Sequence, residues 1–387
     1  MTKLTDHQKK LGYYTVGSQE YYSKLDACIA GTRQNIHPKW HYNDQVWQSI
    51  DWTVEPPIDI LELYKMRARQ IREQYDYVVI YYSGGSDSQT VVESFIDAQC
   101  HIDEVVTAWN RTYDQDFVAR KEITDARNIE AEFELTTRPG LDWIKQVSPK
   151  TKITYHDVSV DIIDCFKGYD GEEWLSEIIE HLNPQAIGRY SAPKAKNQKI
   201  LLDRGMRTAL VYGVDKPKVC IKDGQYCLYF VDVIPNPFKG VTINHDYTNL
   251  YPEFFYWGPD IPEIMVKQAH LIKRWFQQNP ALEPVLAWPN FSWANRNTYE
   301  TVTRSVVYPK WDLRRYQAEK SQFTVYCEWD NWFFKHFKGT VPYHNWKKGI
   351  DYVEANIDKK YLNYTYDNVF NGFVGMINGF YPLDRLA

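Results

Sequence analysis

Long apolar runs are missing from this sequence of 387 residues: no segment approaches the roughly 18 consecutive apolar residues of a membrane-spanning helix. The opening residues, MTKLTDHQKKLGYYTV, also lack the apolar centre of a secretory signal. We therefore expect a cytoplasmic protein that does not contact a membrane. The net charge of −5 provides no general attraction to nucleic acid, so a polyanion would need a local basic patch.

The cysteines lack the spacing of a metal or redox motif. None of them forms a CxxC pair, and no Cys/His set has the spacing of a structural zinc site. We expect most to be free, buried thiols. Cys220 and Cys227 are predicted to face each other across a hairpin, as two such thiols or, less favoured, as a redox pair. The six are Cys28, Cys100, Cys165, Cys220, Cys227 and Cys327.

Two common nucleotide motifs are absent as well: the sequence has neither GxxxxGK[ST] nor a GxGxxG that follows a strand. Aromatic residues, by contrast, are abundant, with 30 Tyr, 14 Trp and 17 Phe. This content favours large side chains that fill the core over a surface for stacking nucleic-acid bases.

The chain divides into three predicted regions. Residues 1–58 are polar, aromatic and broken by prolines, which indicates an irregular or helical arm that packs on a core. Residues 59–235 alternate between strand and helix patterns. Residues 236–387 are predicted to be mainly helical and rich in aromatics, on the acceptor side of the site or for interaction. The clearest helix of this last region spans 261–279.

The middle region predicts an α/β fold: a doubly wound, mainly parallel sheet with helices on both faces. Runs of apolar and β-branched residues predict strands at 77–82, 104–109, 132–137 and 208–214. Helical periodicity predicts helices at 60–74, after residue 88, at 116–131 and at 172–182. Residues 218–233 predict a hairpin that turns at Asp223-Gly224.

The segment SGGSDS, residues 83–88, lies between the first predicted strand and a helix. Two glycines allow a tight turn without Cβ atoms, and the amides at a helix N-terminus attract anions. The serines add hydroxyl donors. Asp87 would repel a bare phosphate, so it indicates either a bound Mg²⁺ or a helix cap. The alternative to a phosphate site is an ordinary N-capped turn.

This hexapeptide resembles the SGGxDS signature of the PP-loop ATP pyrophosphatase superfamily, whose proteins are adenine nucleotide alpha-hydrolase-like and share a HUP-like fold. The resemblance implies ATP and Mg²⁺ as ligands and cleavage to AMP and pyrophosphate. It assigns the pyrophosphate portion to the turn and the metal to Asp87. It places the adenine over the ends of the first two strands, near Tyr82 and the segment 107–110, which includes Trp109. The residues of the turn are Ser83, Gly84, Gly85, Ser86, Asp87 and Ser88.

The order of elements is most similar to the branch of phosphoadenosine phosphosulfate (PAPS) reductases and the small subunit of ATP sulfurylase. The chain departs from the reductases because no cysteine follows Cys327, whereas they carry a C-terminal Glu-Cys-Gly motif. By likeness to this branch, the strand that ends at Gly213 would present Lys216 to the phosphates as a catalytic residue. The alternative for Lys216 is a solvated loop.

Two further groups of residues are candidates for the site. His270, with Glu263 and Lys267 on the same helix face, could serve as a general base; a surface ion pair beside a packed histidine is the slightly favoured alternative. A basic cluster could close over the triphosphate or bind nucleic acid, and a solvated helix face is the commoner outcome. The cluster comprises Lys194, Lys196, Lys199, Arg204 and Arg207.

We therefore expect an enzyme that adenylates an acceptor, by amidation, ligation or sulfur transfer, with a nucleotide or nucleic acid as one class of acceptor. One alternative is a PAPS reductase-like sulfur-transfer enzyme that uses Cys220 or Cys227. Another is an ATP-binding partner protein without catalysis. A homo-oligomer is compatible with each of the three.

Overall fold

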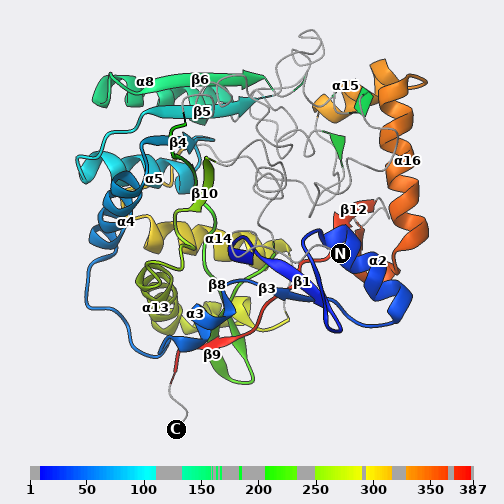
Figure 1. The fold of residues 1–387 in the computed structure, drawn as a ribbon. Helices are drawn as coiled ribbons and strands as arrows, with labels where there is room; N and C mark the ends of the chain where they lie inside the picture. Colours follow the sequence, from blue (N-terminus) through cyan, green and yellow to red (C-terminus); the bar gives the residue numbers. More distant parts are fainter. Residues whose placement is uncertain are drawn as a thin grey trace.

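A five-stranded parallel β-sheet occupies the upper left of the view in Figure 1. The computed structural model describes residues 9–109, 133–157, 205–232, 249–289, 293–315, 328–364 and 370–384, together with residues 159, 163, 166, 167, 183 and 184. The five strands of the sheet are β4 (Tyr77–Tyr81), β5 (Glu104–Trp109), β6 (Lys152–Asp157), β7 (Thr208–Tyr212) and β10 (Leu250–Phe254).

The strand order across the sheet is β10-β7-β4-β5-β6, and every neighbouring pair is parallel. The chain moves outward from β4 to β5 and β6, and then returns to the other side of β4 to form β7 and β10. The order of strands therefore reverses between β4 and β7. In open parallel sheets, ligands bind beside the carboxyl ends of the strands at such a reversal.

Alternation along the strands produces two apolar faces, as the period of two requires. Val78 and Ile80 of β4 belong to the large core that also contains Val91 and Phe95 of α5 (Ser86–Asp97). Val79, Val106, Leu210 and Leu250 form a separate buried cluster on the other face.

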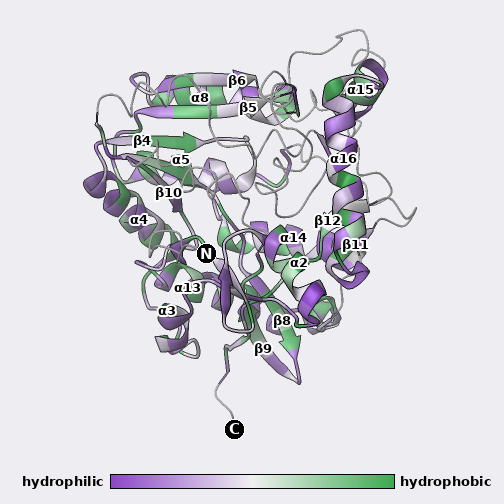
Figure 2. Cartoon of the chain, turned by 45° about the vertical axis from the view of Figure 1, so that its right-hand side comes forward, coloured by the Kyte–Doolittle hydropathy of each residue, from purple (hydrophilic) through white to green (hydrophobic). Residues whose placement is uncertain are grey.

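Two helices, α4 (Ile60–Gln74) and α5, pack together beside β4. Figure 2 shows mainly hydrophilic residues on the outer side of α4, as expected for an amphipathic helix. The predicted α/β fold with a parallel sheet is thus confirmed. The helices predicted at 116–131 and 172–182 lie outside the described residues.

One strand prediction is wrong. Residues 132–137 were expected to form the third strand, but Phe133–Thr137 form the π-helical segment η1, which continues into α8 (Arg138–Val147). The short alternation in EFELTT also fits the start of a helix. Pro139 in the first turn of α8 and the burial of Leu141 and Ile144 favour that helix. The third strand of the sheet is β6.

The first 58 residues are more regular than predicted: their described part, residues 9–58, contains a three-stranded antiparallel sheet, β2-β1-β3, and the helices α2 and α3. Trp47 in this region is fully buried and packs on Phe230, with ring centroids 4.8 Å apart. The bounds are β1 (Tyr13–Val16), β2 (Gln19–Tyr21), α2 (Lys24–Gln34), β3 (Lys39–His41) and α3 (Asp44–Ser49).

The predicted hairpin is present as β8 (Lys218–Lys222) and β9 (Gln225–Tyr229), with Cys220 opposite Cys227. Asp223 and Gly224 both have positive φ angles, as a tight turn requires.

The C-terminal region is mainly helical, and strand β10 from this region joins the sheet. Its short strand β13 (Tyr381–Pro382) pairs with β9. Its other elements are α13 (Glu263–Gln278), η4 (Pro280–Leu286), α14 (Trp293–Val307), α15 (Glu328–Phe337), α16 (Val341–Asn356), η5 (Lys359–Tyr361), β11 (Leu362–Tyr364) and β12 (Phe370–Phe373).

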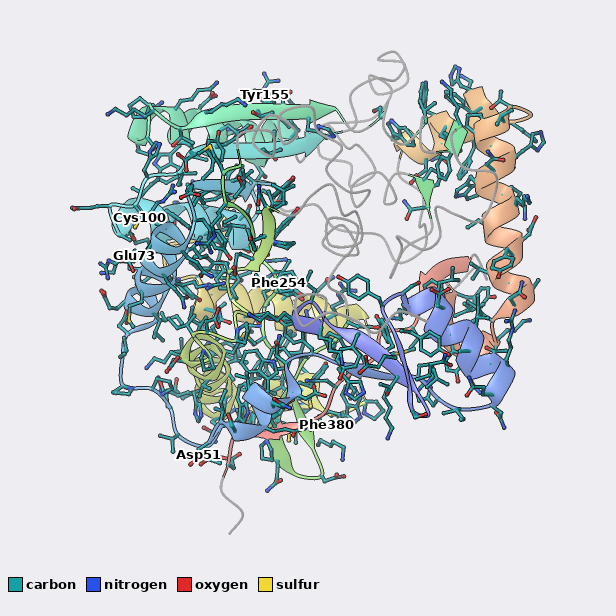
Figure 3. All side chains as sticks on the ribbon, in the orientation of Figure 1. Asp51, Glu73, Cys100, Tyr155, Phe254 and Phe380 are labelled. Atoms are coloured by element: carbon teal, nitrogen blue, oxygen red, sulfur yellow. The ribbon has the colours of Figure 1, made fainter. Side chains whose placement is uncertain are left out.

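In Figure 3, Glu73 and Cys100 lie near the left edge of the view, Tyr155 lies near its top, and Phe254 lies near its centre. No helix among the described residues is both long and apolar enough to cross a bilayer.

Candidate functional site

The turn Ser83–Ser88 connects the carboxyl end of β4 to the first turn of α5, at the reversal of strand order. Gly84 has a φ of +80°, and a Cβ there would lie 2.6 Å from the Cα of Thr137. Glycine is therefore required on both conformational and steric grounds. The Thr137 hydroxyl donates to the Ser83 carbonyl oxygen at 2.6 Å, which fixes the turn against the end of η1.

The start of α5 has no side-chain cap, and the side-chain hydrogen bonds of Ser83 and Ser88 stay within the turn. The Ser83 amide donates to the Ser88 hydroxyl at 3.2 Å, and that hydroxyl also lies 3.2 Å from the Gly85 carbonyl oxygen. The N-cap residue is Gly85, which has no side chain to cap the helix. The exposed Ser83 hydroxyl and the first-turn amides of α5 thus form a surface suited to an anion.

The segment after β7 packs directly on this turn. A Cβ at Gly213 would lie 2.9 Å from the carbonyl carbon of Asp87, so only glycine allows this close approach. Three residues later, the Lys216 Nζ lies 2.7 Å from Asp87 Oδ2. The fold therefore brings together Asp87, Gly213 and Lys216, which were selected from separate parts of the sequence.

Lys216 also contacts Glu300 of α14, with 3.4 Å between Nζ and Oε2. Burial opposes the charge of Lys216, but Asp87, Glu300 and Asp215 outweigh it and raise its pKa. Burial likewise opposes ionisation of Glu300, but Lys216 and the neighbouring cations lower its pKa to about 2. The site therefore contains a protonated lysine beside the ionised carboxylate of Glu300 at neutral pH.

Two tyrosines from the C-terminal region hold Asp87 in place. The Tyr256 hydroxyl donates to the Asp87 carbonyl oxygen at 2.8 Å, and the Tyr308 hydroxyl donates to Asp87 Oδ1. Both side chains are almost completely buried. Burial, and then the charge of Asp87, raise the pKa of Tyr308 well above its ordinary value, so it remains a donor. Neither tyrosine was singled out as a site residue from the sequence.

Replacement of Glu300 by Gln tests this ionic network. Glu300 ionises near 4.5 in an unfolded chain and at about 2 in the folded protein. Its carboxylate therefore stabilises the fold above pH 4.5, and this stabilisation is lost as the pH falls from 4.5 towards 2. We expect the wild type to lose about 3 kcal/mol over this interval through Glu300, at roughly 1.4 kcal/mol per pKa unit.

The measurement is urea unfolding as a function of pH, in which Glu300→Gln should lack this component. Glu73→Gln is the control, because Glu73 is exposed on α4. Identical pH profiles for Glu300→Gln and the wild type would contradict the network.

Tyr82 and Trp109 were predicted to lie near the adenine, and for both residues this stays a prediction. Tyr82 is buried between α5 and α8: its hydroxyl donates to Gln89 at 2.6 Å, and Gly140 packs on its ring. Trp109 is the last residue of β5 and pairs with Asp157, while Asn110 lies outside the described residues. Tyr81 lies at the reversal, where its ring stacks on Tyr212 with centroids 4.4 Å apart.

His270 lies against the N-terminal region. Its Nε2 is 2.9 Å from the Trp52 carbonyl oxygen, and burial lowers its pKa. On the same helix, Lys267 pairs with Glu55 at 2.7 Å and Glu263 is exposed. The described contacts of this helix face are with residues 52–56 and do not reach the turn, so the general-base role of His270 stays a prediction.

In the basic cluster, Lys194, Lys196, Lys199 and Arg204 lie outside the described residues. Arg207 precedes β7 and lies over the rings of Tyr75 and Tyr251, at 5.6 and 5.7 Å. It is thus at the amino end of the sheet, opposite the turn.

The cysteines that the structure describes, at 28, 100, 220 and 227, are free. Burial raises the pKa of Cys220 to about 12. Cys165 and Cys327 are outside the described residues.

Among the described residues, no group of three or more Asp, Glu, His or Cys side chains could hold a metal ion. The single carboxylate of Asp87 fits Mg²⁺, which takes one or two carboxylates and completes its coordination with phosphate oxygens and water. No protein-family profile and no curated protein matches this chain. The function of the turn therefore rests on its own residues and their geometry.

Proposed function

We propose that the chain binds ATP at the Ser83–Ser88 turn, cleaves it between the α and β phosphates and adenylates an acceptor. One observation carries this proposal: the turn lies where the strand order reverses, and Lys216 from the segment after β7 contacts Asp87 within it. The SGGSDS sequence and the strand order together support a HUP-like fold as the finer description.

The residues have separable roles in this reaction. The first-turn amides of α5 and the Ser83 hydroxyl bind the pyrophosphate portion of ATP. Asp87 would hold Mg²⁺, which neutralises phosphate charge when bound. Lys216 stays protonated because Asp87 and Glu300 raise its pKa, so it can stabilise the charge that develops on the leaving pyrophosphate.

The reaction requires positioning more than acid–base chemistry. An oxygen of the acceptor attacks the α phosphorus, the bond from that phosphorus to the bridging oxygen breaks, and pyrophosphate leaves with the electron pair. A nitrogen or sulfur nucleophile then displaces AMP from the adenylated acceptor. An arrangement of fixed donors and one ammonium suits such an in-line displacement.

Sulfur transfer through an internal cysteine receives less support. A relay needs a thiolate, and burial raises the pKa of Cys220 to about 12, while the pKa of Cys227 is also raised by burial. Amidation or ligation is therefore favoured over sulfur transfer. Analysis of the reaction products identifies the chemical class of the acceptor.

The decisive experiment uses ATP labelled at the α phosphate, with Mg²⁺ and panels of carboxylate, nucleotide and tRNA acceptors. We expect labelled AMP and unlabelled pyrophosphate; ADP and phosphate would contradict the proposal. Calorimetric titration with ATP tests binding without an acceptor. Asp87→Ala should lose ATP binding and pyrophosphate release. Asp97→Ala, at the other end of the same helix, should retain ATP binding and pyrophosphate release. An ATP-binding protein without catalysis would bind the nucleotide but release no pyrophosphate with any acceptor.

A further inference from the structure

The two oxygens of the Asp87 carboxylate have different protein partners among the described contacts. Lys216 contacts Oδ2 at 2.7 Å, and the Tyr308 hydroxyl donates to Oδ1. Lys216 carries a flexible ammonium that can leave Asp87 for a phosphate. Tyr308 has a rigid ring that is 1% exposed, and its hydroxyl cannot move without repacking.

Tyr308 is held in turn by its surroundings. It follows α14 directly, and its ring lies 5.6 Å from that of Tyr256, which is fully buried. Tyr256 lies 5.4 Å from the ring of Tyr64, whose hydroxyl donates to the Val307 carbonyl oxygen at 2.8 Å. A packed group of three tyrosines from α4, the segment after β10 and the end of α14 thus fixes the Tyr308 hydroxyl.

We propose that Tyr308 is a positioning residue for the nucleotide-bound metal ion: it fixes Asp87 Oδ1, so that Oδ2 faces the metal when Lys216 turns to the phosphates. This inference rests on the proposed function. It assigns to the C-terminal region a part in ATP binding that the SGGSDS turn alone does not reveal. Hydrogen-bond partners that orient a metal ligand typically change metal affinity by about 10–100-fold when they are removed.

The test compares Tyr308→Phe with Tyr14→Phe. Each removes one buried hydroxyl that donates to a carboxylate, but Tyr14 contacts Asp232 and only Tyr308 contacts the Asp87 carboxylate. The probe is Mn²⁺, which is followed by electron paramagnetic resonance in the presence of a non-cleavable α,β-methylene analogue of ATP. Thermal unfolding of each protein verifies that both variants are folded.

We expect Tyr308→Phe to weaken Mn²⁺ binding by about 10-fold or more while the analogue binds equally well without metal, and Tyr14→Phe to leave both affinities unchanged. A wild-type Mn²⁺ affinity in Tyr308→Phe, or the same loss in both variants, would overturn the positioning role. A wild-type protein that binds neither the analogue nor Mn²⁺ would instead overturn the proposed function, and this inference with it. If Tyr308→Phe does not fold, Tyr308→His, which keeps a donor in the ring, should retain Mn²⁺ binding; its loss would overturn the role.

Discussion

Asp232→Ala should lower the free energy of unfolding by about 3–5 kcal/mol, because it breaks a buried ion pair and leaves a charge without its partner. Asp232 Oδ2 lies 2.7 Å from Lys24 Nζ and accepts from the Tyr14 hydroxyl at 2.8 Å. Its Oδ1 accepts from the Met376 amide at 2.7 Å. The side chains of Lys24 and Asp232 are each 1% exposed, so water cannot replace the lost contacts.

The measurement is chemical unfolding followed by circular dichroism. Asp351→Ala is the matched control, since Asp351 pairs with Lys347 on the surface of α16, and exposed pairs contribute about 0–1 kcal/mol. Because Asp232 joins α2 to residue 376, proteolysis should also cut the N-terminal region of Asp232→Ala sooner. Equal stabilities of the two variants would show that the buried pair of Lys24 and Asp232 does not stabilise the contact between α2 and residue 376.

Lys216→Met should reduce the rate of pyrophosphate release by about 10²–10³-fold, the usual cost of removing one donor that stabilises a developing negative charge. The fold should persist, because Asp87 keeps its contact with Tyr308 and the Asp87 side chain is 27% exposed. Steady-state rates with α-labelled ATP give the effect. ATP affinity should change less than the rate, since Lys216 acts on charge that develops during cleavage.

Lys218→Met is the control for this prediction. Lys218 lies two residues away and pairs with Asp215 at 2.9 Å, and no described contact joins it to Asp87. It should therefore retain most of the wild-type rate. A Lys216→Met enzyme that releases pyrophosphate as fast as the wild type would remove Lys216 from the reaction and favour a role in holding the turn.

The local patterns in the sequence predicted the elements that depend on neighbouring residues. The helix at 60–74, the strand at 77–81 and the hairpin at Asp223-Gly224 all follow from periodicity and turn chemistry. EFELTT was misassigned because six residues of alternation also fit the start of a helix, and the burial of Leu141 and Ile144 then decides the outcome. Base contact by Tyr82 stays a prediction: Tyr82 follows β4, its side chain is buried and its hydroxyl donates to Gln89.

The sequence by itself determined the turn at 83–88, because glycine conformations and helix-terminal amides act over a few residues. Lys216 was nominated only through the resemblance to a known branch of proteins. Only the tertiary structure decided which distant residues surround Asp87. Tyr256 and Tyr308 contact Asp87, and Glu300 contacts Lys216, because the segment after β10 and the end of α14 come close to the turn. No local pattern encodes such contacts. His270 carries the residue type of a general base, yet packing places it against Trp52. Residue type limits the chemistry that a side chain can perform, whereas packing decides what it can reach.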